Sequence, residues 1–487
     1  MFLRILSIAG PVWVYVAIAV LLYGLFLERR RFERLALVPA AGGLIASALF
    51  LSPTHRLFFD EDVYINVASN LTRAPVNQLS VMGAPHDIQA STYPKEPAGW
   101  PVLLSFAFLA AGPNETVAFW FARLLFALVI AAVYHLARAL LPNRKQALVA
   151  AIMFGATPVC FWYSVSAGTD MTSALMAVLG MWGLASANGP LAAAGLAFAA
   201  QTRMELLLLV PLMWFSPEIS RKWKMVAAGL ALFEIVHVGW VISVAPVLER
   251  AEDVQSAFGL GNVGINLRDN LRYLFNPFTF PIMASVFAAL SARRPLPKRE
   301  ALFFWIIGLF AVYLLFYAGS FNTNARYSMQ IVAPLTVLAA SFAKRPVLMV
   351  ALFLSAVVPA TQTYASTPYV QALQADHQFS VLFAKHIQRD DLIISAVQEI
   401  FIDSGMPAIN ASFASMRGER LNEELRRRRK VWYHSGVRAN VLNSDEWRAE
   451  RWMKSNFELH LIESHDVNGF RISFYEVSAK RIDREAR

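Results

Sequence analysis

The chain has 487 residues, of which 56% are hydrophobic and 16% are charged, and its mean hydropathy is +0.44. Soluble globular proteins carry roughly 25% charged residues, so this composition excludes an ordinary soluble protein and predicts a membrane protein. The net charge of +10 would suggest nucleic acid in a soluble domain, but in a membrane protein it is first explained by basic cytoplasmic loops. The single cysteine, Cys160, excludes an intramolecular disulfide and a cysteine-based metal site.

Apolar runs that could cross a bilayer follow one another up to about Tyr364, because a transmembrane helix needs about 20 such residues. Twelve crossings are predicted, at residues 5–27, 35–51, 116–140, 146–163, 171–187, 190–201, 204–215, 225–244, 278–290, 301–318, 327–343 and 347–363. The segment 190–215 is too short for two full spans, so we expect two half-helices separated at 201–205. The short run 100–111 is expected to be an interfacial helix.

Basic residues predict the orientation, because Lys and Arg accumulate in short cytoplasmic loops. Five basic loops fall on one side of the predicted membrane, at residues 29–34, 138–145, 221–224, 293–299 and 344–345. The long polar loop 52–97 then lies on the exoplasmic side. We therefore expect a multi-pass protein of a plasma membrane, the bacterial inner membrane by its composition.

Residues 365–487 have ordinary mixed polarity and are long enough for one small domain. Helical patterns at 379–387 and 421–429 alternate with strand patterns at 392–397, 431–434, 458–462 and 470–477. The predicted fold is an all-α polytopic membrane bundle of about 12 transmembrane helices, residues 1–364, with a large exoplasmic loop at 52–115. A small exoplasmic α/β domain, residues 365–487, follows it.

The densest acidic signal is Asp60-Glu61-Asp62, where the second predicted helix emerges from the membrane. Three adjacent carboxylates at such a boundary repel one another and need water or a cationic partner. They could supply a catalytic base, or they could merely mark a solvated helix end. The many titratable groups in the same loop favour a functional site.

Asp60-Glu61 followed by Tyr64 resembles the Asp-Glu-x-x-Tyr signature in the first exoplasmic loop of the C-type membrane glycosyltransferases. This superfamily includes protein O-mannosyltransferases, lipid A aminoarabinose transferases and oligosaccharyltransferases. Further similar features follow in the family's order: the proline-rich stretch 93–101, Arg123, the second exoplasmic loop at 166–170, and Arg326-Tyr327 before Pro334. The resemblance covers about residues 35–345 and is nearer to the mannosyltransferase and aminoarabinose transferase branch. An extra N-terminal span and the third acid, Asp62, depart from the pattern.

The resemblance implies an inverting glycosyltransferase that moves a hexosyl or pentosyl group from a polyprenyl-phosphate donor to an acceptor hydroxyl on the exoplasmic side. Chemistry agrees, because nucleotide sugars are not supplied there and a lipid-linked donor is needed. Asp60 is the expected general base, with Glu61 second, and Arg326 is expected to stabilise the departing phosphate. The other residues expected to bind the donor are Tyr327, Tyr64, Lys95, Asp170 and Arg203. Arg203 and Glu205 are also read as a structural ion pair.

No cofactor is expected, although a divalent cation, Mg²⁺ or Mn²⁺, could bind Asp60 and Asp170 as in the oligosaccharyltransferase branch. The expected partners are the polyprenyl-phosphate sugar, a lipid, glycan or protein acceptor, and membrane lipids, without nucleic acid. The alternative function is a secondary transporter or lipid flippase, which Glu234 and His237 would serve as buried ionisable groups one helical turn apart. The string Gly259 to Gly264 matches a dinucleotide motif but lacks its context, and it is expected to be a flexible loop.

Overall fold

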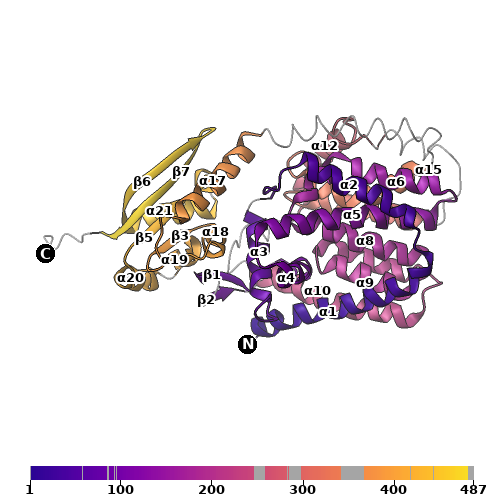
Figure 1. Cartoon of the computed structure of the whole chain (residues 1–487), viewed down its shortest axis with the longest axis horizontal. Coiled ribbons are helices and arrows are strands. Elements are labelled where there is room, and N and C mark those ends of the chain that lie inside the picture. The colour runs from indigo at the N-terminus through magenta and orange to yellow at the C-terminus, as the bar shows by residue number, and fades with distance from the viewer. Residues whose placement is uncertain are drawn as a thin grey trace. The chain divides into compact units, whose positions relative to one another are not determined.

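The computed structural model describes residues 2–57, 59–84, 87–92, 94, 96–245, 258–281, 283, 298–341, 367–416, 418–441 and 444–480. The chain divides into two compact units, which Figure 1 shows as a helical part and a part that contains a sheet. Unit 1 comprises Met1–Arg56, Pro75–Asn77 and Lys95–Tyr364; unit 2 comprises Leu57–Ala74, Gln78–Pro94 and Ala365–Arg487. The stretch 57–94, apart from 75–77, thus belongs to the same unit as the C-terminal segment.

Unit 1 is helical, and its helices follow the order of the predicted apolar runs. They are α1 (Phe2–Glu28), α2 (Leu37–Phe50), α4 (Gly99–Ala111), α5 (Glu115–Leu140), α6 (Arg144–Ala156), α7 (Pro158–Trp162), α8 (Thr169–Ala185), α9 (Gly189–Ala200), α10 (Arg221–Ala245), α12 (Val263–Leu274), α14 (Arg299–Leu315) and α15 (Met329–Ser341). The 3-10 helix η4 (Met204–Met213) follows α9, and the 3-10 helix η7 (Ala325–Ser328) precedes α15. The expected flexible loop at 259–264 is wrong: it holds the 3-10 helix η6 (Leu260–Asn262) and the first residues of α12.

Within the described residues, three helices are long and apolar enough to cross a membrane: Arg4–Arg31, Glu115–Leu140 and Arg221–Trp240. The bent pair Arg144–Ala156 and Pro158–Val165, with 61° between its parts, makes up to four. The predicted spans 35–51, 190–201, 204–215 and 301–318 are shorter apolar helices. Helices α8 and α15 lie at the predicted spans 171–187 and 327–343, and the runs 278–290 and 347–363 lie mostly or wholly outside the described residues. The count of twelve crossings stays a prediction. The two short helices on either side of 201–203 are present, the second as 3-10 rather than α-helix.

Helices α8 and α9 pack closely through small residues. A Cβ added to Gly195 would lie 2.4 Å from the backbone nitrogen of Gly180, and one added to Gly183 would lie 2.3 Å from that of Ala192. Side chains at these glycines would force the helices apart, and such small-residue contacts are typical of helix pairs in membranes. The close packing against α9 thus helps to hold α8 in place.

Several segments next to predicted basic loops contact one another in pairs within unit 1. Lys298 donates a hydrogen bond to the carbonyl of Leu184 at the end of α8, and its Nζ lies 3.6 Å from Oε2 of Glu218. The side chain of Gln146 donates to the carbonyl of Ser341, 3.1 Å away, just before Lys344. Which side of a membrane these segments face stays a prediction.

Unit 2 contains a mixed seven-stranded sheet in the order β2-β1-β4-β3-β5-β7-β6. Its strands are β1 (Leu79–Ala84), β2 (Asp87–Thr92), β3 (Leu392–Ser395), β4 (Ala408–Asn410), β5 (Val431–Ser435), β6 (Phe457–Val467) and β7 (Phe470–Ala479). β3 pairs in parallel with β4 and β5, while the other pairs are antiparallel. Four strands lie where the sequence predicts them. The hairpin of β1 and β2 and the short strand β4 are not among the predicted strands.

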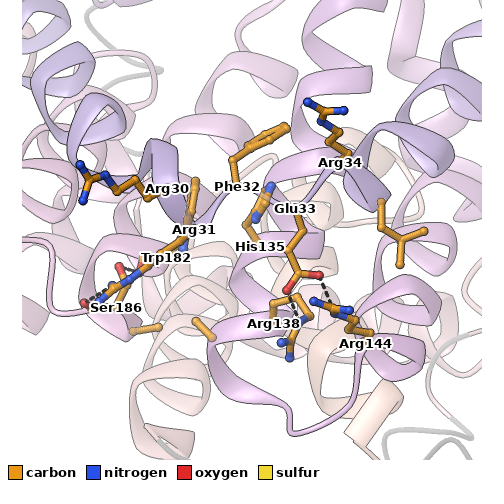
Figure 2. A pocket seen from close by; sticks show the side chains of 13 residues that line it. Arg30, Arg31, Phe32, Glu33, Arg34, His135, Arg138, Arg144, Trp182 and Ser186 are labelled. Atoms are coloured by element: carbon orange, nitrogen blue, oxygen red, sulfur yellow. Dashed lines mark hydrogen bonds and ion pairs between the residues drawn. The ribbon is translucent and has the colours of Figure 1, made fainter.

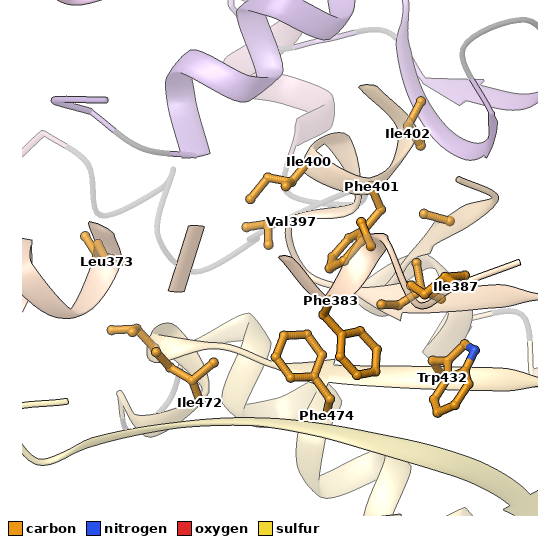
Figure 3. Packing of buried hydrophobic residues seen from close by; sticks show 14 of the residues in the cluster. Leu373, Phe383, Ile387, Val397, Ile400, Phe401, Ile402, Trp432, Ile472 and Phe474 are labelled. Atoms are coloured by element: carbon orange, nitrogen blue, oxygen red, sulfur yellow. The ribbon is translucent and has the colours of Figure 1, made fainter. Parts of the chain in front are cut away.

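Helices cover both faces of this sheet: α17 (Pro368–Ala384), α18 (Gln398–Asp403), α19 (Ala411–Met416), α20 (Gly418–Arg427) and α21 (Asp445–Asn456). Figure 3 shows the core on one face, where Phe383 of α17 stacks on Phe474 of β7 with ring centroids 4.0 Å apart. Ile393 faces this core, whereas Leu392 and Ile394 face the core on the other side. β3 is therefore fully buried between two helical layers, as its unbroken apolar run indicates.

A buried chain of hydrogen bonds joins α17 to the strands. Nε2 of His434 lies 2.9 Å from Oδ1 of Asp376, and its Nδ1 lies 2.9 Å from the hydroxyl of Ser395. All three side chains are at most 2% exposed. A reacting group could not reach this Ser-His-Asp arrangement, so its role is to satisfy polar groups inside the core.

Candidate active site

The three predicted acids lie in the first turn of α3 (Phe59–Leu71), a helix of unit 2. The amino end of a helix carries partial positive charge and unpaired N–H groups, so it stabilises nearby carboxylates in their ionised form. The first turn of α3 is therefore a favourable position for the three acids.

The three acids differ in their surroundings. Glu61 is 0% exposed, and its Oε2 accepts a hydrogen bond of 2.9 Å from the backbone N–H of Leu57. Asp62 is 2% exposed, with its Oδ1 3.6 Å from Nε2 of His377 in α17. Asp60 is partly exposed. A substrate can therefore approach Asp60 more readily than its two neighbours.

An amide network fixes α3 on the sheet. The side chain of Asn70 donates to Oδ1 of Asn66 at 3.2 Å, to the carbonyl of Gln78 at 2.9 Å and to the hydroxyl of Ser80 at 3.0 Å. Asn66 Oδ1 also accepts a bond of 3.0 Å from the backbone N–H of Ser80. Sequence reasoning missed these residues, although two asparagines four positions apart in a largely apolar helix were an available signal.

The C-terminal segment completes this support. The amide of Asn66 donates to Oδ1 of Asp403 at 3.2 Å, at the end of α18. The side chain of Gln398, also in α18, donates to the carbonyl of Ser80 at 3.3 Å and accepts a 2.7 Å bond from Asn410. The acidic helix is thus held by residues more than 300 positions away in the sequence.

A second polar cluster lies in unit 1, where α8 begins and α9 ends. The guanidinium of Arg203 pairs with Asp170 on α8, and its Nη2 lies 2.6 Å from Oε1 of Glu205. Its Nε donates to the same oxygen of Glu205 at 2.7 Å. The sequence-based ion pair between Arg203 and Glu205 is present, with Asp170 as a further partner. Because most donors of Arg203 already face carboxylates, this side chain is poorly suited to hold a phosphate.

Residues of α14, η7 and α15 contact this cluster. The hydroxyl of Tyr313 donates to Glu205 at 2.9 Å, and its ring stacks on Tyr327 with centroids 5.1 Å apart. The guanidinium of Arg203 lies 5.0 Å from the centre of the Tyr327 ring. Gln330 donates to the backbone carbonyl of Asp170 at 3.4 Å. Tyr313 and Gln330 carried no sequence signal, because their role depends on packing between distant helices.

The remaining predicted donor-binding residues fall in different surroundings. Arg326 lies in η7 and is partly exposed, with its guanidinium 5.3 Å from the ring of Tyr327. Tyr64 is 7% exposed on α3, and Lys95 lies outside the described residues. Arg123 is buried in α5, where it donates to the carbonyl of Leu51. Arg326 is therefore the more accessible of the two cations beside Tyr327.

The surroundings of Asp170 do not fit a divalent cation. Its carboxylate pairs with the guanidinium of Arg203, so a metal ion bound there would lie against a fixed positive charge. Metal-binding carboxylates are normally free to face the ion. We therefore derive no step of the reaction through a metal at Asp170.

The two residues that suggest a transporter, Glu234 and His237, lie on α10 of unit 1. Glu234 is 1% exposed and His237 is 0% exposed. Both are thus buried in unit 1, as a proton pathway would require, but buried polar residues in membrane helices also serve packing.

The fold is that of the C-type membrane glycosyltransferases, as the sequence resemblance predicts. The crystal structure of ArnT from Cupriavidus metallidurans bound to undecaprenyl phosphate is similar to this chain with a TM-score of 0.62, over 90% of this chain and 97% of ArnT, at 12% identity. The oligosaccharyltransferase AglB from Archaeoglobus fulgidus, in complex with an inhibitory peptide and a dolichol-phosphate, is similar with a TM-score of 0.52, over 94% of this chain and 75% of AglB, at 12% identity.

The arabinofuranosyltransferase AftD from Mycobacteria shares the fold with a TM-score of 0.50, at 13% identity, over 92% of this chain and 40% of AftD. No protein-family model matches the sequence. No curated protein matches it either. The similarity therefore lies in the fold, and function must be argued from the site.

Proposed function

We propose that the protein is an inverting glycosyltransferase, which moves a sugar from a polyprenyl-phosphate donor to an acceptor hydroxyl on the exoplasmic side of the membrane. The observation that carries the proposal is the similarity of fold over nearly the whole length of ArnT, whose structure holds undecaprenyl phosphate. A second similar structure, AglB, holds a dolichol-phosphate. Two polyprenyl phosphates in proteins of one fold favour a donor of this class.

Asp60 acts as the general base in this proposal. Its carboxylate takes the proton of the acceptor hydroxyl while the hydroxyl oxygen forms a bond to the anomeric carbon, and the bond from that carbon to the phosphate oxygen breaks. Its partial exposure supports this role over Glu61, which is fully buried and accepts the backbone N–H of Leu57. A single displacement inverts the configuration of the anomeric carbon.

Arg326 stabilises the departing polyprenyl phosphate in this proposal. A guanidinium keeps its charge and binds two phosphate oxygens at once, which lowers the energy of the developing anion. Arg203 instead keeps Asp170 and Glu205 neutralised and holds the ring of Tyr327 in place. The two arginines next to Tyr327 thus have separate roles.

The experiment begins with mass spectrometry of lipids that copurify with the protein in mild detergent. Transfer is then measured with a set of synthetic undecaprenyl-phosphate sugars, for the unchanged chain and for Asp60→Asn. Loss of a general base typically lowers the rate about 100- to 10,000-fold, so transfer by Asp60→Asn should fall in that range.

Asp390→Asn is the matched control, because Asp390 is an exposed aspartate of the same unit. It should transfer at the unchanged rate. Normal transfer by Asp60→Asn would remove Asp60 as the base, and the absence of both a bound polyprenyl phosphate and any transfer would refute the proposed function.

The transporter alternative is tested at Glu234, which is buried on α10. For a glycosyltransferase, Glu234→Gln should leave the rate of transfer within about twofold of the unchanged chain. If this variant instead abolished movement of a lipid or solute across a reconstituted membrane, the transporter would be favoured.

A further inference from the structure

A cavity of about 880 Å³ lies in unit 1, between the segment that joins α1 to α2 and the ends of α5 and α8. Figure 2 shows the side chains that line it. Five arginines are among them: Arg30, Arg31, Arg34, Arg138 and Arg144. A single carboxylate, that of Glu33, accompanies them. This excess of positive charge favours the binding of an anion in the cavity.

The one carboxylate is shared by two arginines. Nε of Arg138 lies 3.0 Å from Oε1 of Glu33, and Nε of Arg144 lies 3.1 Å from Oε2. The hydroxyl of Tyr134 donates to Oε2 as well, at 2.6 Å. The bond from Tyr134, together with these arginines, outweighs burial and lowers the pKa of Glu33 below its ordinary value. Glu33 therefore stays ionised, yet it can compensate only one of the positive charges.

The other arginines are less compensated. Arg31 donates to the carbonyl of Ser186 at 3.2 Å and to Glu28 at 3.3 Å. The side chains of Arg30 and Arg34 are exposed and make no hydrogen bond or ion pair with any residue that the structure describes. Their donors are available to a ligand, and guanidinium groups bind phosphate oxygens in a fork.

Apolar groups accompany the arginines. The ring of His135 stacks on Trp182 with centroids 4.7 Å apart, and Phe32 lies 4.7 Å from the same imidazole. Phe32 and Leu35 are also lining residues, yet they are 45% and 38% exposed. An anion with an apolar part fits such a border better than inorganic phosphate does.

The cavity is separate from the candidate active site. Trp182 and Ser186 line it at the carboxyl end of α8, whereas Asp170 lies at the amino end of the same helix. At 1.5 Å per residue, α8 places these ends about 24 Å apart. Two of the predicted cytoplasmic basic loops, 29–34 and 138–145, contribute the arginines.

We propose that this cavity binds a phosphate group, carried by an anionic lipid of the cytoplasmic leaflet. Basic pockets between membrane helices on the cytoplasmic side bind lipid headgroups in this way. The site is independent of the proposed glycosyl transfer, since none of its residues belongs to the candidate active site.

Native mass spectrometry of the full chain in an uncharged detergent tests the proposal. Synthetic phosphatidylglycerol, phosphatidylcholine and water-soluble glycerol phosphate are titrated separately. The key variant is the double substitution Arg30→Gln with Arg34→Gln, because these side chains have no partner among the described residues to lose. Arg29→Gln with Arg221→Gln removes the same charge from two exposed residues outside the lining and serves as the control.

We expect phosphatidylglycerol to bind more tightly than phosphatidylcholine, and the key variant to weaken that binding roughly 10- to 30-fold, while the control changes it less than threefold. Glu33→Gln, which releases Arg138 and Arg144 from their carboxylate, should strengthen it severalfold. Equal binding of the two lipids, or an equal loss in the control, would overturn the proposal. Glycerol phosphate binding as tightly as phosphatidylglycerol would confirm the phosphate site and overturn its lipid source.

Discussion

The two arginines beside Tyr327 show how surroundings decide the role of a residue type. Arg203 lies between two carboxylates, which stabilise its charge but occupy its donors. Arg326 is partly exposed at the start of η7. The sequence alone makes both of them candidates for phosphate binding, because the side chain is a guanidinium at both positions. Burial and the two carboxylates at Arg203 separate them.

Arg326→Gln should lower transfer about 100- to 1,000-fold, because a charged donor that stabilises the leaving anion is lost. The midpoint of thermal unfolding in detergent should stay close to that of the unchanged chain. Rates with a synthetic polyprenyl-phosphate sugar, measured at saturating acceptor, check this. Arg326→Lys should restore part of the rate, and a neutral result for Arg326→Gln would contradict a role in phosphate binding.

Arg203→Leu should instead destabilise the fold by about 3–5 kcal/mol, because it leaves the buried Asp170 and the partly buried Glu205 without their cation. Thermal unfolding in detergent measures the loss. Arg268→Leu is a suitable comparison, since Arg268 is exposed and its carboxylate partner among the described residues is the adjacent Asp269, a pair worth about 0–1 kcal/mol. A stable Arg203→Leu variant with impaired donor binding would show that Arg203 holds the donor after all.

The lowered pKa of Glu33 predicts that the stability of the protein depends on pH. Because its pKa is lowered in the folded protein from an ordinary 4.5, its contribution is fully present above that value and is lost as the pH falls through the lower folded pKa. The unfolding midpoint should therefore fall in acid, and Glu33→Gln should remove part of that fall. Thermal unfolding of both proteins between about pH 3 and pH 7 tests this, and identical acid profiles would contradict it.

At the scale of elements, α3 is the link between the acidic motif and the sheet. The amide of Asn70 joins it to Gln78 and Ser80, and the amide of Asn66 joins it to Asp403. A short helix is marginal in water by itself, so these bonds and the packing beneath them give α3 a fixed position. A general base needs such a position to reach its proton.

Asn70→Ala should destabilise unit 2 by about 1–3 kcal/mol, since buried partners such as Ser80 lose a hydrogen bond. Hydrogen exchange in α3 and β1 should speed up, and transfer should fall although Asp60 is unchanged. Asn456→Ala is the control, because Asn456 is exposed and its side chain donates to the nearby carbonyl of Trp452 in its own helix. Unaltered exchange in α3 would show that Asn70 does not hold this helix.

At the scale of the whole molecule, unit 2 is built from two distant stretches of chain. β1 pairs with β4 through Met82 opposite Ile409 and Gly83 opposite Ala408, so the loop that carries the acidic motif shares a sheet with the C-terminal segment. The C-terminal segment is thus more than an appended domain. It supplies the support on which the candidate base rests.

Removal of residues 365–487 should therefore abolish transfer, although Asp60 and Arg326 remain in the chain. The hairpin of β1 and β2 would lose β4, and two strands alone are marginally stable in water. Limited proteolysis should cleave within 57–94 in the shortened chain and spare this loop in the full one. Substantial transfer by the shortened chain would show that the loop folds without this support.

The sequence by itself determined the helical membrane class, the order of the helices, four strands of unit 2 and the acidic motif, because hydrophobic periodicity and charge are local properties. It did not determine that β1, β2 and β4 form, since β1 pairs with β4 across more than 300 positions and β2 joins the sheet only through β1. Nor could it separate Arg203 from Arg326, or Glu61 from Asp60. The tertiary structure decided these points, because burial and hydrogen-bond partners depend on which distant segments meet.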